Sequence, residues 1–130
     1  IAFYGVGAIT TVNRVQTYES LGNGIRFIGG TVNTKWIVAT NSGENAIAIT
    51  NGWSGTGTNW YLSGSIKSGI KISDNTENSI LNSNITLDNI SILGPTLESG
   101  INYSNGNGTY TLSNIFTSQL NTGIKINPSI

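Results

Sequence analysis

The acidic side chains are the first candidates for chemistry in this chain of 130 residues, because it contains neither histidine nor cysteine. A Ser-His-Asp triad and a thiolate metal site are therefore excluded. Glycoside hydrolysis requires two carboxyl groups roughly 5–10 Å apart. No two acidic residues occupy equivalent positions in neighbouring repeats of the chain; they are Glu19, Glu44, Asp74, Glu77, Asp88 and Glu98. We therefore predict that this chain is not an enzyme and has no catalytic residue.

Metal-assisted lyase chemistry is also disfavoured. It would require an Arg or Lys base beside carboxylates that bind calcium, and Arg14 and Arg26 lack such neighbours. Calcium takes six to eight oxygen ligands with several carboxylates, and Glu44 with amides and hydroxyls is a poor cage. Asp74 and Glu77 are close in sequence, but we expect both in a solvated loop. The sequence predicts no metal site and no cofactor. A polysaccharide lyase or hydrolase with its active site on other coils is the alternative.

Aromatic residues are the main candidates for binding. Trp36 and Tyr61 fall at outward-facing positions of predicted strands, and Trp53 lies in a Gly- and Ser-containing corner. Exposed aromatic rings stack well on sugar rings, while Asn and Thr can hydrogen-bond sugar hydroxyls. We predict Trp36, Trp53 and Tyr61 as glycan contacts. The alternative is that these rings pack beneath an insert or against a neighbouring coil.

A short repeated pattern must position these side chains: a small residue, an Ile, and an apolar residue two positions later. The Ile anchors of the five copies are Ile25, Ile47, Ile70, Ile101 and Ile124. Their intervals are 22, 23, 31 and 23 residues, which places an insert at about residues 75–82. A second β-prone run precedes each anchor, at residues 15–17, 37–39, 60–62, 90–92 and 115–117. Each period therefore holds at least two strands.

The pattern within these runs predicts a solenoid. Apolar and polar residues alternate, so Ile25 and Phe27 should point inward while Arg26 points outward. Clusters of Gly, Asn and Ser between the runs favour corners, because these residues suit positive φ angles and Asx turns. A β-sandwich is the structural alternative, but its strands need not repeat one pattern at a near-constant period. The sequence predicts an all-β, right-handed parallel β-helix of about five coils.

One outward position of this helix carries alternating cations. Between the paired apolar residues the five coils place Arg26, Ala48, Lys71, Asn102 and Lys125. With about 4.8 Å between coils, neighbouring cations would lie roughly 10 Å apart. We predict Arg26, Lys71 and Lys125 as candidate contacts for an anionic polysaccharide. The alternative is a solvated face that discourages aggregation.

Composition excludes some partners. Six basic and six acidic residues cancel, so no net field attracts nucleic acid or an anionic membrane. Charged residues are only 9% of the chain, and no apolar run approaches the roughly 20 residues of a membrane span. We predict neither nucleic-acid binding nor membrane insertion.

Residues 27–35 (FIGGTVNTK), together with residues 3–7 (FYGVG) and 51–55 (NGWSG), carry a family resemblance. About residues 1–62 resemble secreted, pectin-lyase-like right-handed β-helix proteins of Bacteroidetes that carry a Gly-Gly-Thr-Val-Asn-x-Lys repeat. The resemblance implies export to the cell surface, often through the type 9 secretion route with a sorting domain. In this chain the acidic runs of such proteins are largely replaced by neutral residues.

We accordingly expect a single β-helix domain over residues 1–130, as a piece of a longer chain, outside the cell or on its outer surface. Its expected function is adhesion or glycan contact. The expected partners are a polysaccharide or another cell-surface protein, with the secretion machinery recognising a sorting domain elsewhere in the longer chain. A structural stalk or spacer is the alternative function.

Overall fold

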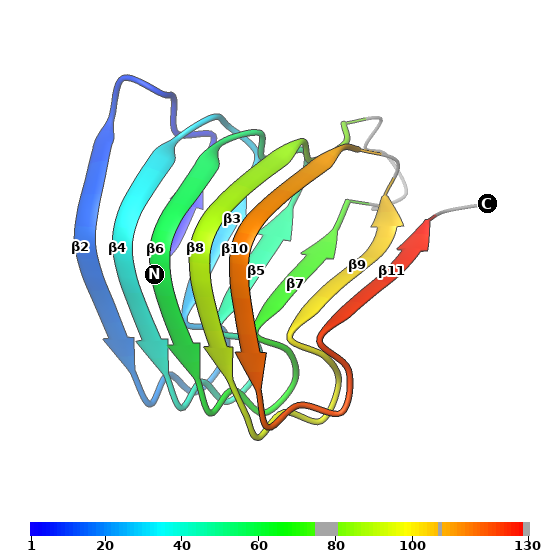
Figure 1. The fold of residues 1–130 in the computed structure, drawn as a ribbon. Coiled ribbons are helices and arrows are strands. Elements are labelled where there is room, and N and C mark those ends of the chain that lie inside the picture. The colour runs from blue at the N-terminus through cyan, green and yellow to red at the C-terminus, as the bar shows by residue number, and fades with distance from the viewer. Residues whose placement is uncertain (75–80, 107, 129–130) are drawn as a thin grey trace.

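The computed structural model of the chain describes residues 1–74, 81–106 and 108–128. These residues form two sheets of strands (Figure 1). In spatial order, sheet A contains β1 (Ala2–Tyr4), β3 (Ile25–Ile28), β5 (Ile47–Thr50), β7 (Ile70–Ser73), β9 (Ile101–Gly106) and β11 (Ile124–Pro128). Sheet B contains β10 (Tyr110–Ser118), β8 (Ile85–Leu93), β6 (Thr56–Ser63), β4 (Asn33–Thr40) and β2 (Thr11–Tyr18).

Successive strands alternate between the two sheets, and every neighbouring pair within a sheet is parallel. The chain therefore winds as a β-solenoid of about five turns, which confirms the predicted all-β parallel β-helix. The described residues contain no helix, and hence none that could cross a membrane.

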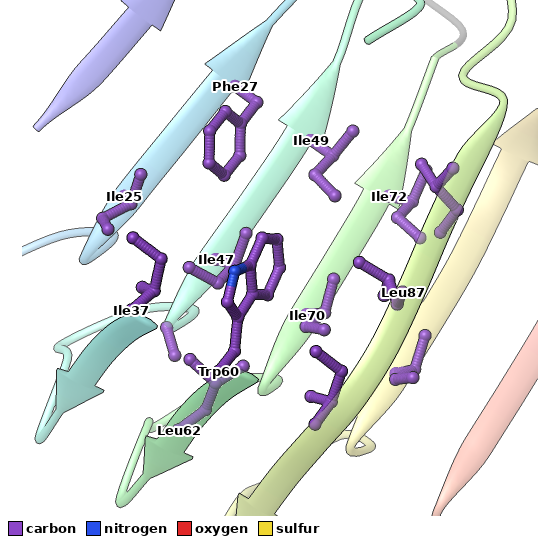
Figure 2. Close-up of a cluster of buried hydrophobic side chains, with 14 of the residues drawn as sticks. Ile25, Phe27, Ile37, Ile47, Ile49, Trp60, Leu62, Ile70, Ile72 and Leu87 are labelled. Atoms are coloured by element: carbon purple, nitrogen blue, oxygen red, sulfur yellow. The ribbon is translucent and has the colours of Figure 1, made fainter. Parts of the chain in front are cut away.

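The predicted column of Ile anchors is confirmed by the strand register. The column runs through Ile25, Ile47, Ile70, Ile101 and Ile124. Its first four members are buried, whereas Ile124 on the last strand of sheet A is 43% exposed. Side chains of both sheets meet in this core (Figure 2). The repeat interval in the sequence is thus the stacking interval of the core.

An aromatic cluster fills the N-terminal half of the core. Phe27 stacks on Trp53 and Trp60, with ring centroids 4.7 and 5.9 Å away. The indole nitrogens donate hydrogen bonds of 3.1 Å, from Trp53 to the Val32 carbonyl and from Trp60 to the Thr34 hydroxyl. These bonds satisfy the polar atoms that burial would otherwise leave without partners.

The position of Trp53 corrects an expectation. We predicted an exposed ring at a corner, but its side chain is fully buried. The neighbouring Gly55 makes room for it, because a Cβ there would lie 2.7 Å from the indole ring. Trp53 is therefore a core residue and offers no surface to a ligand.

Sheet B bends at one residue in each strand. These residues hold positive φ angles of 57°, 61°, 57°, 58° and 51°, and they are Arg14, Trp36, Asn59, Asn89 and Asn114. The flanking residues remain in register, so the five form one column, termed here the left-handed column. Like a β-bulge, each places two consecutive side chains on the outer face. The inward alternation then resumes one position later.

Asp74 corrects a second expectation. We predicted a solvated loop, but Asp74 is only 2% exposed. Its carboxylate accepts hydrogen bonds from the backbone N–H and hydroxyl of Ser83, both at 2.6 Å, and from the Gly52 N–H at 3.2 Å. These bonds fasten the residues that flank the insert to the preceding coil. Glu77 and most of the predicted insert lie outside the described residues.

Candidate functional site

A groove of about 480 Å³ crosses the outer face of sheet B along the left-handed column. Four strands, β2, β4, β6 and β8, contribute to it. Its lining residues are Arg14, Val15, Gln16, Trp36, Ile37, Val38, Asn59, Trp60, Tyr61, Asn89 and Ser91. We call this feature the sheet B groove. Its length follows the stacking direction of the coils, so a ligand in it would contact several coils at once.

Two of the predicted aromatic contacts lie in the sheet B groove. Trp36 is 49% exposed and Tyr61 is 43% exposed. They belong to neighbouring strands, and Tyr61 pairs in register with Val38, two positions after Trp36. The prediction that both rings face outward from adjacent coils is confirmed. Both rings line the groove, on the paired strands β4 and β6.

The backbone of Trp36 is unusual. Its φ of 61° lies in the left-handed region, where a bulky side chain costs roughly 1–2 kcal/mol. The described residues provide no side-chain hydrogen bond to the indole, and the Lys35 ammonium lies 5.9 Å from the centroid of its ring. Backbone strain of this kind concentrates at functional positions. The observation supports Trp36 as a binding residue.

Polar groups surround the aromatic surface. Asn89 donates a 2.6 Å hydrogen bond to the Asn59 side-chain oxygen, which holds both amides in place. Gln16 and Ser91 provide further donors and acceptors on the outward column that contains Tyr61. Arg14 supplies a guanidinium group. None of the described residues that line the groove is acidic.

The predicted row of cations on sheet A has the expected register: Arg26, Ala48, Lys71, Asn102 and Lys125 pair successively. It is not an open row, however, because Ala48 and Asn102 are buried at 9% and 5% exposure. Buried Ala48 therefore separates Arg26 from Lys71, and buried Asn102 separates Lys71 from Lys125. The predicted alternation of cations with uncharged residues is present in the register, and the contact of these cations with an anionic polysaccharide stays a prediction.

Lys71 and Lys125 instead line a separate polar hollow of about 450 Å³. Lys71 forms a salt bridge of 3.8 Å with Glu98, which offsets part of its charge. Asn102 also donates to Glu98 at 3.2 Å. None of the described residues that line this hollow is aromatic, so they offer no ring of the kind found in the sheet B groove.

Glu44, Glu98 and Asp88 make contacts within the scaffold. Glu44 and Glu98 occupy the same corner position two coils apart, and Lys67 lies between them because its N–H binds the Glu44 carbonyl and its carbonyl accepts from the Glu98 N–H. Asp88 accepts hydrogen bonds of 2.8 Å from Ser113 and Asn114, which lower its pKa. Across the described ranges no three acidic residues cluster as a metal site would require. The absence of a metal site remains a prediction.

The strand register and the alternation of strands between two parallel sheets define the class of this protein as a parallel β-helix, with a groove on the outer face of sheet B. The family model described as a pectate-lyase like beta helix domain matches residues 1–129, so the chain belongs to that family. No curated protein and no solved structure matches the chain significantly.

Sequence reasoning missed Arg14 and the polar lining residues of the groove. A signal was present: Asn59, Asn89 and Asn114 each precede the first apolar residue of their run. Arg14 and Trp36 stand at the same place in the first two coils. This column of Asn residues indicates the bend in sheet B, and it marks Arg14 and Trp36 as the two positions where another residue replaces Asn.

Proposed function

We propose that this chain is a non-catalytic β-helix module that contacts glycans through the sheet B groove. The observation that carries the proposal is Trp36, an exposed indole held at a strained left-handed position beside exposed Tyr61. A purely structural column would be served better by asparagine, which occurs in three of its five positions. The strain is explained if the indole binds a ligand.

The surroundings suit a sugar. Aromatic faces stack on the C–H faces of sugar rings, and amides, hydroxyls and a guanidinium at the edges bind sugar hydroxyls. The rings lie on strands of the solenoid, so little conformational entropy is lost when a ligand binds them. The same contacts would serve adhesion to a polysaccharide or to a glycan on another cell surface.

A glycan array tests the proposal. Replacing Trp36 or Tyr61 by Ala should weaken binding about fivefold or more, because each ring contributes roughly 1 kcal/mol of stacking. Phe116→Ala is the matched control: Phe116 is 58% exposed and belongs to the same outward column as Tyr61, but it lies outside the groove. Equal losses in Phe116→Ala, or no binding by any glycan, would contradict the proposal.

The non-catalytic part of the proposal is supported by the carboxylates. The buried Asp74 carboxylate accepts hydrogen bonds from Ser83 and Gly52. Lys67 lies between Glu44 and Glu98 and keeps these two acidic residues apart. Incubation with polygalacturonate or alginate, with calcium and with a chelator, should release neither unsaturated nor reducing ends. Release above the level of a heat-denatured sample would instead support a polysaccharide lyase or hydrolase.

We further propose that the protein is located outside the cell. This location is supported by the resemblance of residues 1–62 to secreted Bacteroidetes β-helix proteins exported through the type 9 route. Surface proteolysis and fractionation of the organism of origin would test it. Recovery of the protein in the soluble intracellular fraction would contradict this part.

A stalk or spacer is the second candidate function. Each strand pairs only with strands of adjacent coils, so such a scaffold can extend coil by coil. The glycan array also separates the two functions. Binding that depends on Trp36 supports the module, whereas no binding to any glycan favours the spacer.

A further inference from the structure

The left-handed column of sheet B has an uneven composition. Three coils place Asn there, while the first two place Arg14 and Trp36, at φ angles of 57° and 61°. These two residues share one register position, because Asn13 pairs with Lys35 and Val15 with Ile37. The two bulky side chains therefore stand in adjacent coils at one end of the sheet B groove.

This end of the groove is positively charged. Arg14 is exposed, and within the described part of the chain its guanidinium has no hydrogen-bond or salt-bridge partner. The Lys35 ammonium lies 5.9 Å from the Trp36 ring centroid and adds a second positive charge beside the groove. Asp88, which precedes the lining residue Asn89, is occupied by hydrogen bonds from the last coil.

The chemistry of a free guanidinium beside an aromatic platform indicates the ligand class. Arg presents parallel N–H donors that match the paired oxygens of a carboxylate or a sulfate. The groove crosses four strands, a length of about 14 Å at the usual strand spacing, and its described lining carries no opposing carboxylate. Charge complementarity therefore favours a short stretch of an acidic glycan over a neutral one.

We infer that Arg14 is a specificity-determining residue, which selects glycans bearing an acidic group next to the sugar that stacks on Trp36. The inference rests on the proposed glycan-binding function. The acidic group is a carboxylate or a sulfate, since both offer the same paired oxygens. The left-handed backbone of residues 14 and 36 brings the charge and the ring to the same end of the groove.

Matched oligosaccharides test the inference: neutral, carboxylated and sulfated members built on the same glucose and galactose backbones. The chain should prefer one acidic series over its neutral counterpart at least about tenfold, and the preference should shrink at high salt. Arg14→Asn, which installs the residue usual in the column, should reduce the preference to near unity. Arg14→Lys should keep part of it, and Phe116→Ala should keep all of it.

Each outcome decides the inference. A preference that survives Arg14→Asn overturns it, as does equal binding of neutral and acidic members. In the latter case, loss of binding in Trp36→Ala would still support the proposed function. Failure of every oligosaccharide to bind overturns both. The carboxylated and sulfated series show which acidic group is recognised, and thermal melting of each variant confirms that the fold is intact.

Discussion

The side-chain amide of Asn89 donates a 2.6 Å hydrogen bond to the side-chain oxygen of Asn59 in the preceding coil, and both residues hold positive φ angles. Asparagine suits the left-handed column of sheet B for two reasons. It tolerates a positive φ angle, and its side chain can form a hydrogen bond with the residue in the neighbouring coil. Trp36 holds the same position without such a bond in the described structure. Trp36 therefore gains neither the backbone tolerance nor the neighbouring hydrogen bond that asparagine has at this position.

Trp36→Asn should therefore stabilise the fold while it weakens glycan binding. Relief of left-handed strain is worth on the order of 1 kcal/mol, and little core contact is lost because Trp36 is 49% exposed. Urea denaturation should show a higher midpoint than for the wild type. A variant that is destabilised by more than about 1 kcal/mol would show that the ring is needed for packing.

Ile70→Ala should destabilise the solenoid by about 2–5 kcal/mol. Ile70 is fully buried between the anchors of the coils on either side, so the cavity weakens two interfaces. Ile124→Ala provides the control at the same register position, where the side chain is 43% exposed. Its cost in urea denaturation should be clearly smaller. Equal costs would contradict a core formed by stacked coils.

Asp74→Asn should destabilise the fold by roughly 1–3 kcal/mol. The carboxylate accepts three hydrogen bonds, two at one oxygen from the Ser83 hydroxyl and the Gly52 N–H, and one at the other oxygen from the Ser83 N–H. In Asn an NH2 donor replaces one oxygen, so the bonds to that oxygen are lost and two donors face each other. Ser83→Ala removes the hydroxyl donor but leaves the two backbone bonds, so it should cost less. Thermal melting of the two variants compares them, and the reverse order of stability would argue against this role of Asp74.

Stability should fall at alkaline pH through Tyr103. Burial raises the pKa of Tyr103 above its usual 10.0, and the negative charge of Asp74 adds to the shift. The fold thus favours the neutral phenol, which donates to the Ser83 carbonyl at 3.2 Å. This contribution is fully present below the unfolded-state pKa and is lost as the pH rises through the higher folded-state value.

Urea midpoints measured from about pH 8 to pH 11 would show this loss. Tyr103→Phe should be less stable than the wild type at the lower pH and should lose less stability across the range. An identical pH dependence in both proteins would assign the alkaline loss to other tyrosines.

The stacking of coils could be predicted from the sequence because each turn of a solenoid contributes the same core positions, which therefore recur in the sequence once per turn. Ile25 and Ile47 lie opposite each other because their spacing is one turn, and the same reasoning placed Trp36 and Tyr61 on the outside. Strand periodicity reports which face a side chain occupies within a strand. That local rule was sufficient for these residues.

The rest depended on neighbours that are distant in sequence. Trp53 lies in a corner, where strand periodicity does not apply, and its burial was decided by the Val32 carbonyl and by the space beside Gly55. The groove beside Arg14 required a backbone bend repeated in register across four strands. Composition and period thus determined the scaffold, whereas contacts between coils decided which side chains are covered and which are exposed in the groove, because exposure is a property of the packed neighbours.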